Sequence, residues 1–170
     1  MSIRHAFAST SLGELLLVAE GEALVGVYFE AHAHPPDPER IGETVGERQD
    51  ALLARAASEL REYLSGERRV FEVPVAMRGD AFSERVWELL RAIPYGSTTS
   101  YGALARELGG PGLAQRVGQA VGHNPISIIV PCHRVLGADG SLTGYAGGLD
   151  RKRALLALEE PDAADAGRLF

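Results

Sequence analysis

Residues 129–135 read Ile-Val-Pro-Cys-His-Arg-Val, and they contain the only cysteine in a chain of 170 residues. An apolar run brings this thiol, Cys132, to the end of a predicted strand, and an imidazole follows it directly. A lone thiol cannot form an internal disulfide, and it is too few for a cysteine-based metal site. Cys132 is therefore either a buried core residue, as free cysteines usually are, or the centre of the chemistry.

Cys132 and His133 can cooperate only under a geometric condition. Cysteine attacks as its thiolate, so a base must take the proton of Cys132. His133 is adjacent, but neighbouring side chains in a strand point to opposite faces. The pair therefore works only if the chain turns at Cys132 or if a water joins the two side chains. His133 also needs an orienting acceptor, and the spacing does not choose among Asp139, Asp150 and Glu159.

The second half of the chain has the periodicity of short helices. The first is predicted over Phe82–Ile93. Ser100 is a suitable N-cap for a second over Tyr101–Leu108, and after the Gly109-Gly110 turn a third runs from Pro111 to about Gly122. Two short helices joined by a glycine turn are typical of a helix-turn-helix, although ordinary helical hairpins share the pattern.

The third of these helices has one face with little side-chain bulk. Gln115, Gly118 and Gly122 align there at helical spacing. An interior glycine costs roughly 1 kcal/mol relative to alanine, which a helix tolerates where something bulky must come close. A facing helix and a nucleic-acid backbone both meet that condition.

The end of this half holds three further predicted elements. They are a short buried strand over Ser127–Val130, a hairpin turn over Ala138–Ser141 that could form a wing, and a last helix over Arg151–Glu160 capped by Asp150.

The first half of the chain is predicted to be a small α/β unit of antiparallel strands and one long helix. The elements are strands over Ser2–Ser9, Glu14–Ala19, Ala23–Phe29 and Val70–Val75, a helix over Gln49–Leu64, and a surface loop over Ala31–Gly46. His32 and His34 lie in that loop, but no cysteine or carboxylate pattern accompanies them. We therefore predict no metal site.

Composition limits the partners and the location. The net charge of −6 at first argues against nucleic acid, because phosphate binding needs Lys and Arg. Residues 1–79 hold 13 acidic and 8 basic residues, whereas residues 80–160 hold 8 of each, so the second half permits such a partner. No apolar run approaches the roughly 20 residues of a membrane span, and the first residues lack a signal-peptide pattern. We expect a cytoplasmic protein without membrane contact.

The motifs around Cys132 resemble the O6-alkylguanine-DNA alkyltransferases, also called methylated-DNA–protein-cysteine methyltransferases. The resemblance covers roughly residues 82–159, and the first half fits as the variable first domain of that family. It implies an α+β protein, with a small ribonuclease H-like α/β domain over residues 1–79 and a winged helix-turn-helix domain with an acidic tail over residues 80–170. The matching residues are Asn124-Pro125, Pro131-Cys132-His133-Arg134-Val135, Gly144-Tyr145, Lys152, Leu155-Leu156 and Glu159.

The resemblance also implies the reaction. Proteins of this family flip an O6-alkylated guanine out of duplex DNA and move the alkyl group irreversibly onto a cysteine sulfur. This is DNA repair by direct reversal (EC 2.1.1.63), in which each molecule acts once and needs no cofactor. Activity on O4-alkylthymine stays open. We expect a monomer, and cooperative assembly along DNA stays open as well.

Residue roles follow from the same resemblance. Cys132 is the nucleophile and alkyl acceptor. His133 draws its proton through a water, Glu159 orients His133, and Asn124 supports the turn that presents the thiol. Tyr101 donates to the base as guanine leaves and helps to rotate the nucleotide.

Other positions are implied to contact the base or the DNA. Tyr145 and the backbone of Ala146 line the base pocket. The helix that begins at Pro111 docks in the minor groove as the recognition helix, where Gly118 and Gly122 allow close approach to the DNA.

One departure from the family pattern falls in this helix. The family usually carries Arg-Ala-Val-Gly, and its arginine enters the duplex stack where the flipped base was. Here the string is Gln115-Arg116-Val117-Gly118, so the arginine comes one residue, or about 100°, later. Three explanations compete. Gln115 could fill the stack itself, Arg116 could reach the stack through a local distortion of the helix, or the chain could be a variant with weakened activity. We favour the first.

Two other classes of protein compete with this interpretation. Alkyltransferase-like proteins bind lesions and resemble the same domain, but they lack the reactive cysteine. A Cys-His hydrolase would need turnover and an oxyanion hole, for which the sequence gives no separate signal. The presence of Cys132 favours the alkyltransferase.

Overall fold

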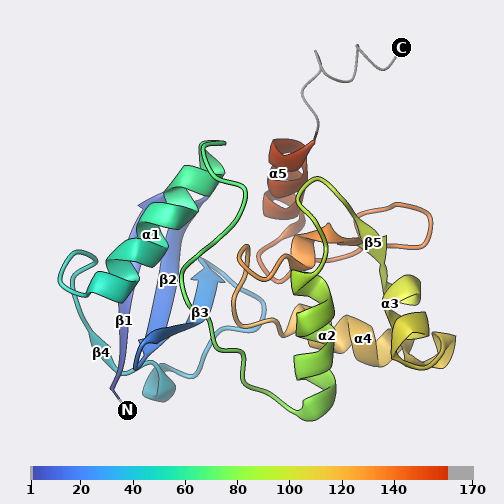
Figure 1. The fold of residues 1–170 in the computed structure, drawn as a ribbon, viewed down its shortest axis with the longest axis horizontal. Helices are drawn as coiled ribbons and strands as arrows, with labels where there is room; N and C mark the ends of the chain where they lie inside the picture. The colour runs from blue at the N-terminus through green and yellow to red at the C-terminus, as the bar shows by residue number, and fades with distance from the viewer. Residues whose placement is uncertain (1, 161–170) are drawn as a thin grey trace.

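The computed structural model describes residues 2–160 and places two parts side by side, a sheet with one helix and a group of helices (Figure 1). This mixture of helices and strands confirms the predicted α+β class. The acidic tail expected over residues 161–170 lies outside the described residues. Across the described part, no helix is long and apolar enough to cross a membrane.

The N-terminal part is a four-stranded sheet with one helix packed on it. Its elements are β1 (Ile3–Thr10), β2 (Gly13–Glu20), β3 (Ala23–Phe29), a 3₁₀ turn (Pro38–Arg40), β4 (Glu43–Thr44) and α1 (Ala51–Leu64). The sheet order is β3-β2-β1-β4, with β4 parallel to β1 and the other pairs antiparallel. The three long strands and the helix confirm the prediction, whereas β4 and the 3₁₀ turn interrupt the loop expected over Ala31–Gly46.

The helix α1 covers one face of the sheet because its apolar stripe meets the inward side chains of the strands. Leu15 of β2 and Leu53 of α1 are both fully buried in this core. Burying such a side chain stabilises the fold by roughly 1.5–3 kcal/mol. The Asp50 side chain caps α1 by accepting from the Leu53 N–H at 3.0 Å, so the helix begins at Ala51 and not at the predicted Gln49.

The strand predicted over Val70–Val75 is wrong. The backbone N–H groups of Glu72 and Val73 donate to the Glu59 carboxylate of α1, at 2.8 and 3.0 Å, instead of to a neighbouring strand. Within this segment only Val75 forms an isolated bridge, with β3. A buried side-chain acceptor has replaced the ladder of a strand.

The C-terminal part consists of α2 (Ala81–Arg91), β5 (Thr99–Ser100), α3 (Tyr101–Leu108), α4 (Ala114–Gly122), β6 (Val135–Leu136) and α5 (Leu149–Glu159). Helices α3 and α4 form the predicted helix-turn-helix. Ser100 caps α3 as expected, and the turn uses φ values of +138° at Gly109 and +155° at Gly110, which L side chains rarely adopt. Helix α4 begins at Ala114 and not at Pro111, because residues 111–113 form a 3₁₀ turn.

The segment before the cysteine is not the strand predicted over Ser127–Val130. It is a tight turn in which Ile128 has a φ of +72°, and Cys132–Arg134 then form a 3₁₀ turn. The cysteine therefore follows a turn and does not end a strand.

Two further details of this part differ from the expectation. The turn at Ala138–Ser141 is present, but β6 just before it pairs in parallel with β5. Helix α5 starts at Leu149 after Gly148, so Asp150 lies in its first turn and is not its cap.

The two parts meet along β3, at the edge of the sheet. The Val27 N–H donates to the Pro125 carbonyl at 2.9 Å, and the Ser127 N–H donates to the Val27 carbonyl at 3.2 Å. The sheet edge therefore holds the turn that precedes Cys132.

Glu59 offers a test of this architecture. Replacing it (Glu59→Ala) leaves one buried and one part-buried backbone N–H group without an acceptor, so we expect the free energy of unfolding to fall by about 2–4 kcal/mol. Urea unfolding measures the loss. Glu88→Ala, at an exposed site of α2, should stay within about 0.5 kcal/mol of the parent, and equal losses in the two variants would contradict this account.

Candidate active site

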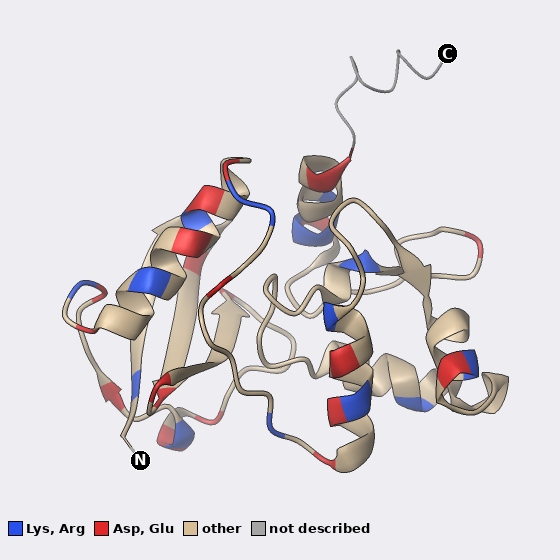
Figure 2. Cartoon of the chain, viewed as in Figure 1, with Lys and Arg blue, Asp and Glu red and all other residues tan. Residues whose placement is uncertain are grey.

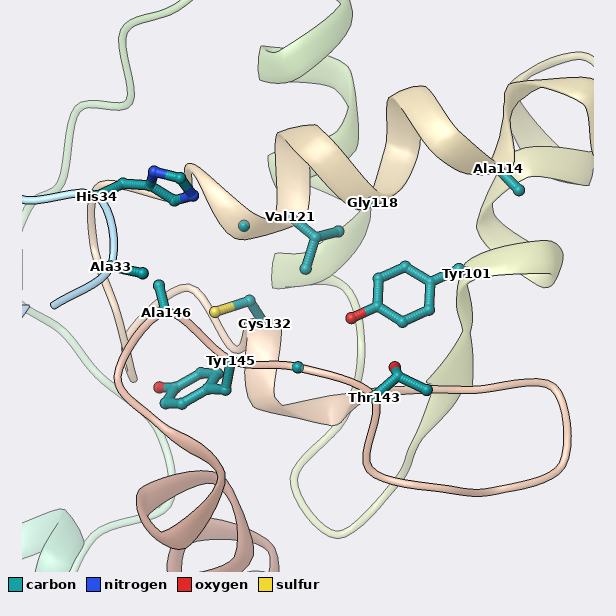
Figure 3. A pocket seen from close by; sticks show the side chains of 12 residues that line it. Ala33, His34, Tyr101, Ala114, Gly118, Val121, Cys132, Thr143, Tyr145 and Ala146 are labelled. Atoms are coloured by element: carbon teal, nitrogen blue, oxygen red, sulfur yellow. The ribbon is translucent and has the colours of Figure 1, made fainter.

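Cys132 opens onto a cavity of about 510 Å³ between α4, α3 and the loop around Tyr145. Figure 3 shows Tyr101 reaching in from α3 with its hydroxyl toward Cys132, and Ala146 and His34 on the opposite side. The N-terminal part also contributes to this wall through Ala33 and His34, which sequence reasoning did not foresee.

Asn124 builds the turn that presents the thiol. Its side-chain oxygen accepts from the Ile126 N–H at 3.0 Å, and its amide nitrogen donates to the Val130 carbonyl at 2.8 Å. The positive φ of Ile128 costs about 1–3 kcal/mol. A backbone bond from Val130 to Ile126, at 3.0 Å, closes the same turn and helps to offset that cost.

Of the three candidate carboxylates, Glu159 is the one that faces His133. The His133 Nε2 atom lies 2.8 Å from a Glu159 oxygen, and both residues are buried. Asp139 instead accepts from the Ser141 N–H, and Asp150 pairs with an arginine at the surface.

Two more side chains donate to Glu159, and both were missed at the sequence level. Arg134 donates to one carboxylate oxygen through Nε at 2.7 Å and to the other through Nη2 at 2.8 Å. The Tyr63 hydroxyl of α1 donates to the oxygen that faces His133. Two features of the sequence could have pointed to them: Arg134 directly follows Cys132-His133, and Tyr63 lies on the apolar side of its helix.

The protonation of the pair follows from these contacts. Burial by itself would raise the pKa of Glu159, but the hydrogen bonds from His133 and Arg134 outweigh it and hold that pKa well below its usual range. An ionised Glu159 only accepts, so Nε2 of His133 carries the proton and Nδ1 keeps its lone pair. That Nδ1 atom is buried and bonds to none of the described residues. Burial lowers the pKa of His133 despite the carboxylate.

The Cys132 thiol and the nearby ammonium group of Lys152 are two further ionisable groups at the site. Burial raises the pKa of the Cys132 thiol, while the Asn124 amide and the positive charge of Lys152 act in the opposite direction. Lys152 is fully buried and donates to the carbonyls of Val135 and Gly144, at 2.7 and 2.9 Å. The resting thiol thus keeps its proton, and the site contains a cation that favours its loss.

The glycines of α4 line the cavity, and the polar residues before them do not. A Cβ atom at Gly122 would meet none of the described atoms within 4 Å, and one at Gly118 would meet the Tyr101 ring at 3.9 Å. Close packing inside the protein therefore does not explain them. Gln115 and Arg116 are both exposed, and the Arg116 guanidinium lies 4.1 Å from the ring centre of Phe82 in α2.

Tyr145 and Ala146 lie in the loop that bounds the cavity opposite Tyr101. The Ala146 carbonyl accepts from the Ala33 N–H at 2.8 Å, and the Tyr145 ring packs against Phe29 with ring centres 5.9 Å apart. The loop is thus fixed by contacts with the N-terminal part.

Fold and site together define a protein with a ribonuclease-like part and a helix-turn-helix part, the second of which carries a buried cysteine beside a His–Glu pair. Residues 3–77 match the ribonuclease-like domain of the 6-O-methylguanine DNA methyltransferases, and residues 81–161 match their DNA binding domain. The chain therefore belongs to this family.

Individual relatives agree with that assignment. The methylated-DNA–protein-cysteine methyltransferase of Mycolicibacterium paratuberculosis is 43% identical over 168 residues, which cover 99% of each chain. The protein of the same name from Mycobacterium tuberculosis is 43% identical over 161 residues, or 95% of this chain and 94% of its own. The crystal structure of Mycobacterium tuberculosis OGT in complex with DNA matches with a TM-score of 0.84 at 42% identity, covering 92% of each chain.

His32 makes the loop beside the cavity sensitive to acid. Its Nδ1 atom accepts from the Phe29 N–H at 3.3 Å, and burial, aided by charge on His34 and Arg151, lowers its pKa from 6.5 to about 4. A depressed pKa means that the folded state resists protonation, so stability is lost as pH falls from 6.5 toward 4. His32→Asn, which keeps an acceptor and cannot titrate, should lose less stability over this range.

Urea unfolding at a series of pH values measures the effect as the slope of unfolding free energy against pH. The other acid-sensitive groups are common to both proteins, so identical slopes in the parent and in His32→Asn would contradict the assignment.

Proposed function

We propose that this chain repairs O6-alkylguanine in duplex DNA by direct reversal, as a methylated-DNA–protein-cysteine methyltransferase (EC 2.1.1.63) that acts once. The observation that carries the proposal is the Cys132 thiol, which lines a cavity of about 510 Å³ next to a buried His133–Glu159 pair. A cavity of this size suits a small ligand such as an extrahelical base.

The reaction begins with the proton of the thiol. A water passes this proton from Cys132 to Nδ1 of His133, and the ionised Glu159 stabilises the imidazolium that results. The sulfur attacks the alkyl carbon, the bond from that carbon to O6 breaks, and a thioether forms. The Tyr101 hydroxyl, which faces Cys132 across the cavity, donates a proton to the departing guanine. The phenolate then takes back a proton from the imidazolium through water, so the thiol proton ends on guanine and the side chains return to their resting state.

The C-terminal part supplies the DNA contact in this proposal. Helix α4 docks in the minor groove, where Gly118 and Gly122 leave the cavity mouth open to a flipped nucleotide. Tyr145 and the backbone of Ala146 hold the base. The family membership and the DNA-bound structure of the Mycobacterium tuberculosis relative support duplex DNA as the partner.

The decisive experiment separates this function from its two rivals. Incubating the protein with an O6-methylguanine duplex should add the mass of one methyl group to Cys132 in each molecule, and Cys132→Ser should gain none. Intact-mass and peptide mass spectrometry measure the gain. Tight binding with unchanged mass would indicate a lesion-binding protein, and repeated turnover would indicate a hydrolase; either result overturns the proposal.

Gln115 is proposed to fill the stack after the base has flipped. An arginine there would fill more of the space and add a phosphate contact, so Gln115→Arg should increase the rate of methyl transfer from duplex DNA several-fold. Reaction with free O6-benzylguanine, which has no stack, should hardly change. Single-turnover assays on both substrates measure this difference.

The matched control is Gln119→Arg, which adds the same charge one turn later on α4. Equal acceleration by both variants would assign the effect to charge alone, and unchanged duplex rates in Gln115→Arg would remove the role of Gln115.

A further inference from the structure

Tyr63 joins the N-terminal part to the His133–Glu159 pair. It lies near the end of α1, is fully buried, and donates its hydroxyl to Oε2 of Glu159. The same oxygen accepts from His133 Nε2 and from Arg134 Nη2, each at 2.8 Å. The Tyr63 oxygen is also 3.5 Å from His133 Nε2, so it lies against both members of the pair.

Packing alone does not require this hydroxyl. The Tyr63 ring packs against Phe71 and Tyr95, with ring centres 5.3 and 6.1 Å apart, and a phenylalanine ring would make the same contacts. The hydroxyl instead satisfies one lone pair of a buried carboxylate, where a missing donor is costly. Burial, followed by the contact with Glu159, raises the pKa of Tyr63, so the phenol keeps its proton and stays a donor.

The hydroxyl affects how strongly Glu159 holds the imidazole. Each donor to a carboxylate stabilises its charge and weakens its attraction for the next donor. With Arg134 and Tyr63 both in place, Glu159 orients His133 while leaving the imidazole neutral at rest. Without the phenol, the carboxylate attracts the imidazole proton more strongly and favours the imidazolium.

We propose that Tyr63 is a positioning residue through which the N-terminal part tunes the His133–Glu159 pair for alkyl transfer. The proposal rests on the proposed function, because it assigns His133 as the base of that reaction. The other titratable or charged side chains that face the pair are Arg134, Lys152, Cys132, Tyr95 and Tyr145.

The test is the pH profile of Tyr63→Phe. The base must be neutral, so the rate of alkyl transfer rises with pH as His133 loses its extra proton. Removing the phenol should move this acid limb to higher pH by roughly one unit, with little change in the plateau. The shift should be the same for an O6-methylguanine duplex and for free O6-benzylguanine, because it arises in the pair and not in DNA binding.

Tyr95→Phe is the matched control. Tyr95 packs against Tyr63 and donates its hydroxyl to the Leu158 carbonyl at 3.1 Å, so this variant removes a neighbouring phenol without touching the carboxylate. Its acid limb should match that of the parent. An unshifted limb in Tyr63→Phe, or an equal shift in Tyr95→Phe, would overturn the proposal.

A second measurement keeps this proposal separate from the proposed function. NMR of the His133 ring nitrogens follows protonation without any alkyl transfer. The titration should move to higher pH in Tyr63→Phe even if the duplex reaction fails, and an unmoved titration would rule out the role of Tyr63.

Discussion

The carboxylate of Glu159 is a buried charge, and much of the site depends on how that charge is compensated. Removing a carboxylate from water costs several kcal/mol unless it is paired and hydrogen-bonded. Arg134 supplies the opposite charge, and His133 and Tyr63 complete the shell. These donors come from a 3₁₀ turn and from α1, while Glu159 ends α5. The full set of donors to the carboxylate is therefore assembled only when the two parts of the molecule are docked.

Docking also fixes the two segments that bound the cavity. The edge strand β3 pairs with the turn held by Asn124, and the Ala33 N–H bonds to the loop at Ala146. Arg151 of α5 reaches back to the carbonyls of Leu12 and Glu30 at 3.0 and 2.9 Å. Figure 2 shows acidic and basic residues interspersed along α1, so the acidic excess of the first half is not gathered on that helix. The N-terminal part thus acts as a frame for the site.

Periodicity predicted the elements whose backbone bonds are regular. The strands of the first half and the helices of both halves follow apolar patterns, and Ser100 caps its helix as expected. The two strands that were predicted wrongly share one physical cause. At residues 70–75 and 127–130, side chains of Glu59 and Asn124 take the backbone partners that a strand would use. An apolar pattern reports burial, and it does not report which group satisfies the backbone.

The sequence likewise indicated only part of the site. The thiol, the imidazole and the glycine face could be identified from neighbouring residues, and the resemblance added Glu159. Residue spacing alone could not choose that carboxylate, because the choice depends on a contact between residues 26 positions apart. Tyr63 was missed for the same reason: 96 positions separate it from Glu159. The first contact depends on how α5 packs against the turn at Cys132, and the second depends on how the two parts dock.

Arg116 of α4 lies next to the position at which the family carries its arginine, but its contacts do not suit it to the same role. Arg116 is the one charged residue of that helix, and its guanidinium rests on the Phe82 ring. Such a contact is worth about 0.5–1 kcal/mol at an exposed site. Arg116 would lose it if its side chain moved about 100° around the helix to the Gln115 position. Gln115 needs no such movement, because it is exposed and stands one turn before Gly118, which lines the cavity. In the proposed reaction, this cost therefore favours Gln115 over the neighbouring arginine as the side chain that fills the stack.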